Sequence, residues 1–125
     1  NRPERSEAYT LQEGEKKVEY KEDEKLFNAG MFRLNREDHT LGNILRMQLL
    51  EDSNVTFAAY QHPHPLSNHI LLRVQCKADE QSKPQEAMFD AINKIEERLI
   101  QVDEELKKAL KEFDETQDFG GDFSP

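Results

Sequence analysis

The fold of this chain is decided by residues 37–50, which read EDHTLGNILRMQLL. Asp38 or Thr40 suits the start of a helix, because a side-chain oxygen there accepts a hydrogen bond from the free amides of the first turn. The following apolar residues recur at the spacing of one helical face, and residues 52–54 (DSN) end the segment. The segment therefore predicts a short amphipathic helix whose apolar face contains Leu41, Ile44, Leu45 and Leu49.

A glycine, Gly42, lies inside this predicted helix. Glycine in a helix interior costs about 1 kcal/mol relative to alanine, so it is usually found where a larger side chain would obstruct a neighbour. Gly42 therefore indicates that another backbone or side chain approaches the helix closely at this position.

Strands are predicted on both sides of the short helix, because apolar and polar residues alternate there with a period of two. In residues 31–35, for example, Phe32 and Leu34 share one face. A stiff loop, His62-Pro63-His64-Pro65, separates the last two strands. The predicted strands cover residues 18–20, 31–35, 55–60 and 70–76.

A second, longer helix is predicted after residue 82. Ser82 and Gln85 form a capping-box pattern, and Pro84 is tolerated in a first helical turn. Apolar residues then recur in alternating steps of four and three, which is the heptad spacing of a coiled-coil stripe. The stripe contains Met88, Ile92, Ile95, Leu99, Val102, Leu106, Ala109 and Phe113.

The order of elements is therefore β-β-α-β-β-α, an α+β fold with a mainly antiparallel sheet. The apolar stripe of the long helix extends for about 39 Å at 1.5 Å per residue, whereas strands of five to seven residues extend for about 17–24 Å. Because the stripe is longer than such a sheet, we expect the long helix to form a dimer face against a partner helix. A solvated single helix is the alternative.

Composition and charge limit the function. Acidic residues outnumber basic residues 26 to 17, a formal net charge of −9, which argues against independent binding to nucleic acid. No apolar stretch approaches the roughly 20 residues that span a bilayer, so no membrane partner is expected. The single cysteine, Cys76, cannot form an internal disulfide, which fits a reducing compartment.

One domain is expected over residues 1–113, with residues 1–17 as an extended N-terminal arm. Large apolar residues are concentrated in residues 26–75, whereas residues 101–125 contain 8 acidic and only 3 basic residues. Residues 114–125 are therefore expected to form a mobile acidic tail.

The sequence predicts no catalytic, cofactor-binding or metal-binding residue. His62, His64, His69 and Cys76 lack the paired short spacings of a structural zinc site. Cys76 alternates in phase with apolar strand residues, so it is interpreted as a core thiol. Glu37 and Asp38 precede a helix, where acidic side chains are stabilised by the helix dipole.

Residues 39–50 resemble the signature helix of the alpha-type subunits of cellular RNA polymerases, in which His-Thr-Leu-Gly-Asn precedes an apolar pair, a basic residue and a Leu-rich turn. The resemblance continues in the strands, the loop and the start of the long helix, at residues 57–60, 64–66, 72–75 and 84–87. Residues 2–5, 13–17 and 28–29 are similar to the smaller alpha-like subunits of eukaryotic RNA polymerase II. The counterparts shared by polymerases I and III usually have a longer acidic N-terminal region.

The resemblance implies a non-catalytic nuclear assembly subunit that forms an obligate heterodimer with a larger alpha-like subunit. In this family the pair is the platform on which the second-largest polymerase subunit docks, and it supports mRNA transcription. The implied heterodimer interface is Leu41, Gly42, Ile44, Leu45, Leu49, Met88, Ile92, Ile95, Leu99, Val102 and Leu106. The implied candidates for contacts with the large subunit are His39, Thr40, Asn43 and Arg46. Met47 stands where bacterial alpha subunits have a second arginine, so a contact through that charge is not carried over.

Two alternatives remain open at this stage. The first is the equivalent subunit shared by polymerases I and III. The second is a free-standing interaction module that pairs with itself through the same stripe. A small zinc or thiol enzyme is disfavoured by the absence of a ligand or nucleophile pattern.

Overall fold

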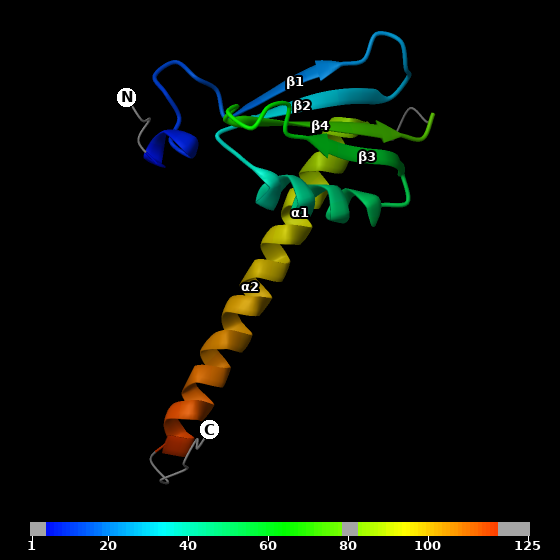
Figure 1. Cartoon of the computed structure of the whole chain (residues 1–125). Coiled ribbons are helices and arrows are strands. Elements are labelled where there is room, and N and C mark those ends of the chain that lie inside the picture. Colours follow the sequence, from blue (N-terminus) through cyan, green and yellow to red (C-terminus); the bar gives the residue numbers. More distant parts are fainter. Residues whose placement is uncertain (1–4, 79–82, 118–125) are drawn as a thin grey trace. The chain divides into compact units, whose positions relative to one another are not determined.

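The computed structural model describes residues 5–78 and 83–117, with the element order β-β-α-β-β-α preceded by a short 3-10 turn (Figure 1). This order confirms the predicted α+β fold. The elements are η1 (Arg5–Ala8), β1 (Val18–Glu22), β2 (Ala29–Asn35), α1 (His39–Leu50), β3 (Val55–Gln61), β4 (His69–Cys76) and α2 (Pro84–Gln117).

The four strands form one antiparallel sheet in the order β1-β2-β4-β3. Phe32 of β2 lies between Tyr20 of β1 and Leu72 of β4, and the centroids of the Tyr20 and Phe32 rings are 4.7 Å apart. The predicted alternation in residues 31–35 therefore places Phe32 on a face shared by three strands. That face is the apolar side of the sheet.

The apolar face of the sheet forms the core of residues 1–92, which make up one compact unit. α1 lies across this face and contacts β3 and β4 (Figure 1). Leu49 of α1 and Leu72 of β4 are both fully buried, and the first turns of α2 add further buried side chains to the same unit. Buried apolar residues include Phe32, Leu34, Leu45, Leu49, Ile70, Leu72, Val74, Cys76, Ala87, Met88 and Ala91.

α1 begins where the sequence predicted it. Asp38 is the N-cap, and its Oδ1 accepts a hydrogen bond from the backbone N–H of Thr40 at 3.0 Å. Of the two residues predicted as the N-cap, Asp38 therefore caps α1, and Thr40 lies inside the first turn of the helix. The carboxylate satisfies one amide that the helix leaves unpaired, which fixes the start of the helix.

The N-terminal arm is fixed to the corner between β2 and α1. The Arg36 guanidinium donates to both carboxylate oxygens of Glu15, at 2.9 and 3.0 Å. The Lys17 Nζ lies 2.6 Å from Oε1 of Glu37. Arg36 has a φ of 61°, a left-handed conformation that is uncommon outside glycine. The arm is therefore anchored at residues 15–17, and it contains the turn η1 rather than extended chain alone.

α2 continues to Gln117, four residues beyond the predicted end of the domain at Phe113. Residues 114–117 contain neither glycine nor proline, so nothing in their sequence breaks the helix. The part of α2 from Asn93 to Gln117 belongs to a second unit. The rest of the predicted acidic tail (118–125), the first four residues of the predicted arm and the predicted cap Ser82 lie outside the described residues.

Candidate dimerisation surface

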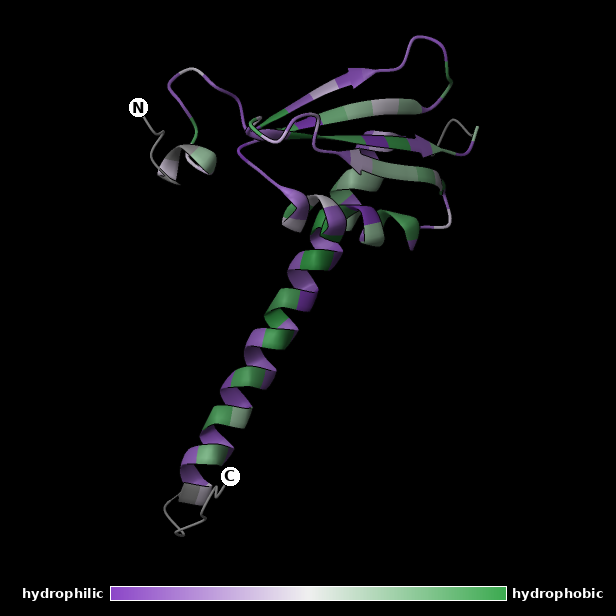
Figure 2. Cartoon of the chain, in the orientation of Figure 1, coloured by the Kyte–Doolittle hydropathy of each residue, from purple (hydrophilic) through white to green (hydrophobic). Residues whose placement is uncertain are grey.

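The part of α2 that lies beyond residue 92 carries large apolar side chains on its surface. Leu99 is 64% exposed, Val102 60% and Leu106 57%. Figure 2 shows hydrophobic positions recurring along α2 between hydrophilic ones. Single exposed apolar residues are common, but a continuous apolar row is typical of a surface that binds another protein.

The exposed residues form one stripe. At 3.6 residues per turn, steps of four and three return to the same side of a helix, so Leu99, Val102 and Leu106 lie in line. Ile100 is also 53% exposed, but it lies about 100° around the helix from Leu99. We name Ile95, Leu99, Val102, Leu106, Ala109 and Phe113 the α2 stripe.

One predicted α2 residue is buried within its own chain. Met88 is 5% exposed because it packs inside the unit formed by residues 1–92. Ile92 is 49% exposed and Ile95 is partly exposed. The side chain of Met88 therefore lies in the core of its own chain, the exposed apolar surface starts at Ile92, and a role for Met88 in the interface stays a prediction.

Three predicted α1 residues are likewise covered by the chain's own sheet. Leu45 and Leu49 are 3% and 0% exposed, and Gly42 is buried beneath the Tyr60 ring. These three residues pack against the sheet of their own chain, and their assignment to the interface stays a prediction. Of the predicted α1 residues, Ile44 is exposed and Leu41 is partly exposed.

Sequence reasoning missed the outward face of α1. Met47 and Leu50 are exposed apolar side chains on the same helix as the buried Leu45 and Leu49. The signal was present, because the apolar residues of α1 occupy more than one side of the helix. The sheet covers one apolar side of α1, and the exposed Ile44 and Met47 make the other side a candidate surface for a partner.

Of the four polar candidates on α1, His39, Asn43 and Arg46 make side-chain contacts within the chain. The Nδ1 of His39 lies 3.2 Å from the hydroxyl of Tyr60, and the Arg46 Nη2 donates to Oδ1 of Asn43 at 2.7 Å. His39, Thr40 and Asn43 are exposed, and Arg46 is partly exposed. Contacts of these side chains with a large subunit remain a prediction.

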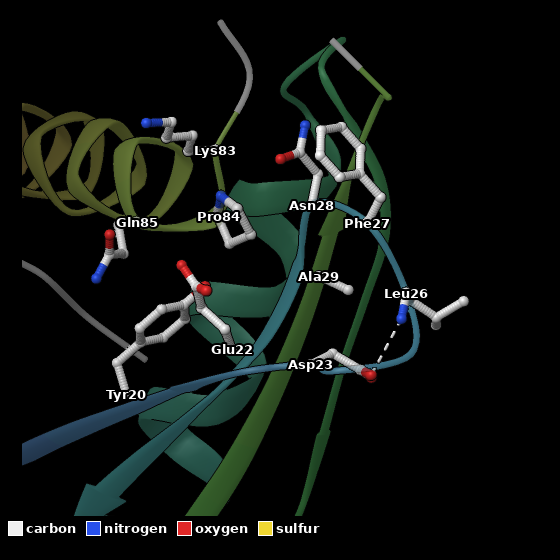
Figure 3. A pocket seen from close by; sticks show the side chains of 10 residues that line it. All are labelled: Tyr20, Glu22, Asp23, Leu26, Phe27, Asn28, Ala29, Lys83, Pro84 and Gln85. Atoms are coloured by element: carbon white, nitrogen blue, oxygen red, sulfur yellow. Dashed lines mark hydrogen bonds between the residues drawn. The ribbon is translucent and has the colours of Figure 1, made fainter. Parts of the chain in front are cut away.

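A pocket of about 620 Å³ lies beside the turn between β1 and β2 (Figure 3). Its carboxylate Asp23 accepts hydrogen bonds from the backbone N–H groups of Lys25 and Leu26, at 2.8 and 3.2 Å, and lies 2.6 Å from an Arg73 nitrogen. The backbone hydrogen bonds chiefly lower the pKa of Asp23, so its charge stabilises the turn. The residues that line the pocket are Tyr20, Glu22, Asp23, Leu26, Phe27, Asn28, Ala29, Lys83, Pro84 and Gln85.

Other reactive groups are also placed in structural roles. Cys76 is buried at the end of β4, and burial raises the pKa of its thiol, which opposes formation of the nucleophilic thiolate. Within residues 5–78 and 83–117, no three His, Cys, Asp or Glu side chains come together to hold a metal ion. No helix in the same residues combines the length and apolarity that crossing a bilayer requires.

Comparisons with known proteins agree with this geometry. A family model described as the RNA polymerase Rpb3/Rpb11 dimerisation domain matches residues 29–105. The chain is 39% identical to the probable DNA-directed RNA polymerase II subunit RPB11 of Caenorhabditis briggsae over 118 residues, 94% of each protein. It is 42% identical to the RNA polymerase II subunit RPB11 of Schizosaccharomyces pombe over 102 residues, 82% of this chain and 80% of that protein.

The fold is also similar to a solved structure. The crystal structure of DNA-directed RNA polymerase subunit L from Thermoplasma acidophilum superposes with a TM-score of 0.62, covering 78% of this chain and 94% of that one at 22% identity. The resemblance read from residues 39–50 is therefore confirmed by the family model and by the relatives. The chain belongs to the RNA polymerase Rpb3/Rpb11 dimerisation family, and it is similar over most of its length to RPB11 subunits of RNA polymerase II.

Proposed function

We propose that this chain pairs with an Rpb3-like larger alpha-like subunit and that the pair is the platform on which the second-largest subunit of RNA polymerase II docks. The description of the family, which names two kinds of chain and a dimerisation domain, supports the pairing. The names of the relatives support a place in RNA polymerase II, and hence in the nucleus and in mRNA transcription. The other core subunits of the polymerase then assemble on this heterodimer.

The observation that carries the proposal is the exposed α2 stripe. Burying one large aliphatic side chain stabilises an association by about 1.5–3 kcal/mol. Covering Leu99, Val102 and Leu106 therefore contributes several kcal/mol, which offsets part of the entropic cost of associating with a partner helix. The same stripe left in water would promote non-specific association.

The outward face of α1 supplies a second apolar surface. Ile44 and Met47 are 43% and 57% exposed and lie three residues apart, so they share one side of the helix. We propose that they are covered in the heterodimer together with Leu41. The proposed interface is thus Leu41, Ile44, Met47, Ile92, Ile95, Leu99, Val102 and Leu106.

Contacts with the second-largest subunit are proposed for the polar side of α1. His39, Thr40 and Asn43 are exposed polar residues near the N-terminal end of the helix, and Arg46 follows them by one turn. The Arg46 guanidinium has five N–H donors, of which the bond to Asn43 uses one, so it can also hydrogen-bond a carboxylate on the large subunit.

Co-expression with the Rpb3-like subunit, followed by gel filtration, tests the proposal. The account expects a stable one-to-one complex, whereas the chain expressed alone forms weak or heterogeneous oligomers. A monodisperse homodimer that ignores the Rpb3-like subunit would instead favour a self-pairing module.

A further inference from the structure

The α2 stripe is bordered by charged side chains whose pattern restricts the partner. Asp103 and Glu105 flank the middle of the stripe, on opposite sides of Val102 and Leu106. Both are exposed, and the three lysines of this half of the helix lie away from the stripe, on the back of the helix. The middle of the stripe is therefore bordered by acidic groups on both sides.

An antiparallel pair of two copies buries the whole stripe in matched layers. Ile95 then faces Phe113 of the second copy, Leu99 faces Ala109, and Val102 faces Leu106. In this register the border residues at the centre meet their own copies, so Asp103 faces Asp103 and Glu105 faces Glu105. Like charges at these positions oppose the association.

The other contacts in a pair of two identical chains do not remove the repulsion between these carboxylates. Arg98 meets Glu112 of the second copy in the antiparallel register, which favours pairing at the two ends but leaves the centre acidic. A parallel pair sets Arg98 against Asp103, but it brings the N-terminal ends of both helices together, where Met88 is already buried in each folded unit. The centre of the stripe is thus poorly suited to a second copy.

Asp103 also has a partner within its own helix. The Lys107 Nζ lies 2.9 Å from Asp103 Oδ2, with both side chains more than half exposed. An exposed pair of this kind is weak and leaves the carboxylate within reach of a second cation. Asp103 and Glu105 therefore both present a negative charge beside the stripe, and we name these two residues the acidic border.

We propose that Asp103 and Glu105 determine partner choice: they oppose self-pairing and favour a helix that carries Lys or Arg beside the middle of its own apolar stripe. This inference rests on the proposed function, because it requires the α2 stripe to be the dimer face. It adds the chemistry by which a heterologous partner is distinguished from a second copy.

Substitutions that remove or reverse the charges of Asp103 and Glu105 in the full chain test the inference. The variant D103N/E105Q removes the border charge, and D103K/E105K reverses it. The matched controls E97Q/E104Q and E97K/E104K make the same changes of net charge at exposed positions on the back of the helix. Self-association is measured by sedimentation equilibrium at low and high salt, and binding to the Rpb3-like subunit is measured by titration.

Four results are expected. D103N/E105Q lowers the dissociation constant of self-association about threefold to tenfold, as two exposed like-charge contacts imply. A mixture of the wild-type chain with D103K/E105K forms mixed pairs. D103K/E105K binds the Rpb3-like subunit about threefold to tenfold more weakly than E97K/E104K does. These differences shrink in 1 M salt, where the Debye length falls to about 3 Å.

The inference is overturned if the border variants and their controls behave alike, because net charge alone then accounts for the change. It is also overturned if the wild-type chain self-associates as tightly as D103N/E105Q. Failure of the proposed function is a different result: the wild-type chain then does not bind the Rpb3-like subunit at all.

Discussion

Gly42 of α1 lies directly against the aromatic ring of Tyr60 in β3. A Cβ atom at residue 42 would lie 2.6 Å from Cδ2 of Tyr60 and 3.0 Å from Cδ1 of Ile70, which is closer than packed carbon atoms come. The close approach that glycine indicated in the sequence is thus made by the chain's own sheet, and no second helix is needed to explain it. Gly42 sets the distance between α1 and the sheet.

Replacing Gly42 with alanine is therefore expected to destabilise the fold, although alanine is the better helix former. The added methyl group must displace the Tyr60 ring, and overpacking of this kind costs about 1–3 kcal/mol. Urea unfolding measures the change in the free energy of unfolding. The cost of Gly42→Ala is expected to fall in a Tyr60→Leu background, because the smaller side chain leaves room. An equal cost in both backgrounds would show that Tyr60 is not the obstructing group.

The two sides of α1 are expected to respond differently to truncation. Leu45→Ala removes a fully packed side chain and should lower the free energy of unfolding by about 2–5 kcal/mol. Met47→Ala removes an exposed one and should change it by less than about 0.5 kcal/mol. The affinity for the Rpb3-like subunit should show the opposite order: Met47→Ala weakens the complex, whereas Leu45→Ala, where it still folds, has the smaller effect on binding. If Met47→Ala leaves binding unchanged, the outward face of α1 is not part of the interface.

The anchored N-terminal arm predicts a dependence of stability on pH. The Arg36 guanidinium, which donates two hydrogen bonds to Glu15, holds the pKa of that carboxyl below its ordinary value of 4.5. A carboxyl whose pKa is lower in the folded state stabilises the fold above the unfolded pKa. This contribution is lost as the pH falls from about 4.5 through the lower, folded value.

Glu15→Gln should accordingly flatten the loss of stability between neutral pH and the acid range. The matched control is Glu13→Gln, a change at an exposed glutamate two residues away. Thermal unfolding at a series of pH values compares the two variants. If Glu15→Gln and Glu13→Gln give the same pH profile, the contact between Glu15 and Arg36 does not contribute to stability in solution.

The strands and helices could be predicted because each depends on local periodicity. Phe32 and Leu34 alternate, and Leu99, Val102 and Leu106 follow heptad spacing, so the element type was fixed by the residues themselves. α2 extends to Gln117, beyond the expected start of the acidic tail at Asp114, because nothing in residues 114–117 breaks a helix.

The candidate surface was only partly predictable, because periodicity shows that a residue is apolar and not which neighbour covers it. Leu45 and Ile44 are adjacent and equally apolar, but one is buried by the sheet and the other is exposed. The division depends on how β3 and β4 lie beneath α1, which is a long-range property. The contact between Arg36 and Glu15 is likewise absent from any local pattern, since it joins residues 21 positions apart.

If the α2 stripe binds the Rpb3-like subunit, a charge introduced at Leu99 by the variant Leu99→Asp should disrupt the complex. Ile100→Asp is the matched control, because Ile100 is similarly exposed on the same turn but lies off the stripe. Titration of each full-length variant with the Rpb3-like subunit gives the two dissociation constants. We expect Leu99→Asp to weaken binding more than about tenfold, because an unpaired charge enters a desolvated interface, and Ile100→Asp to change it less than about twofold. Equal dissociation constants for the two variants would contradict binding through the α2 stripe.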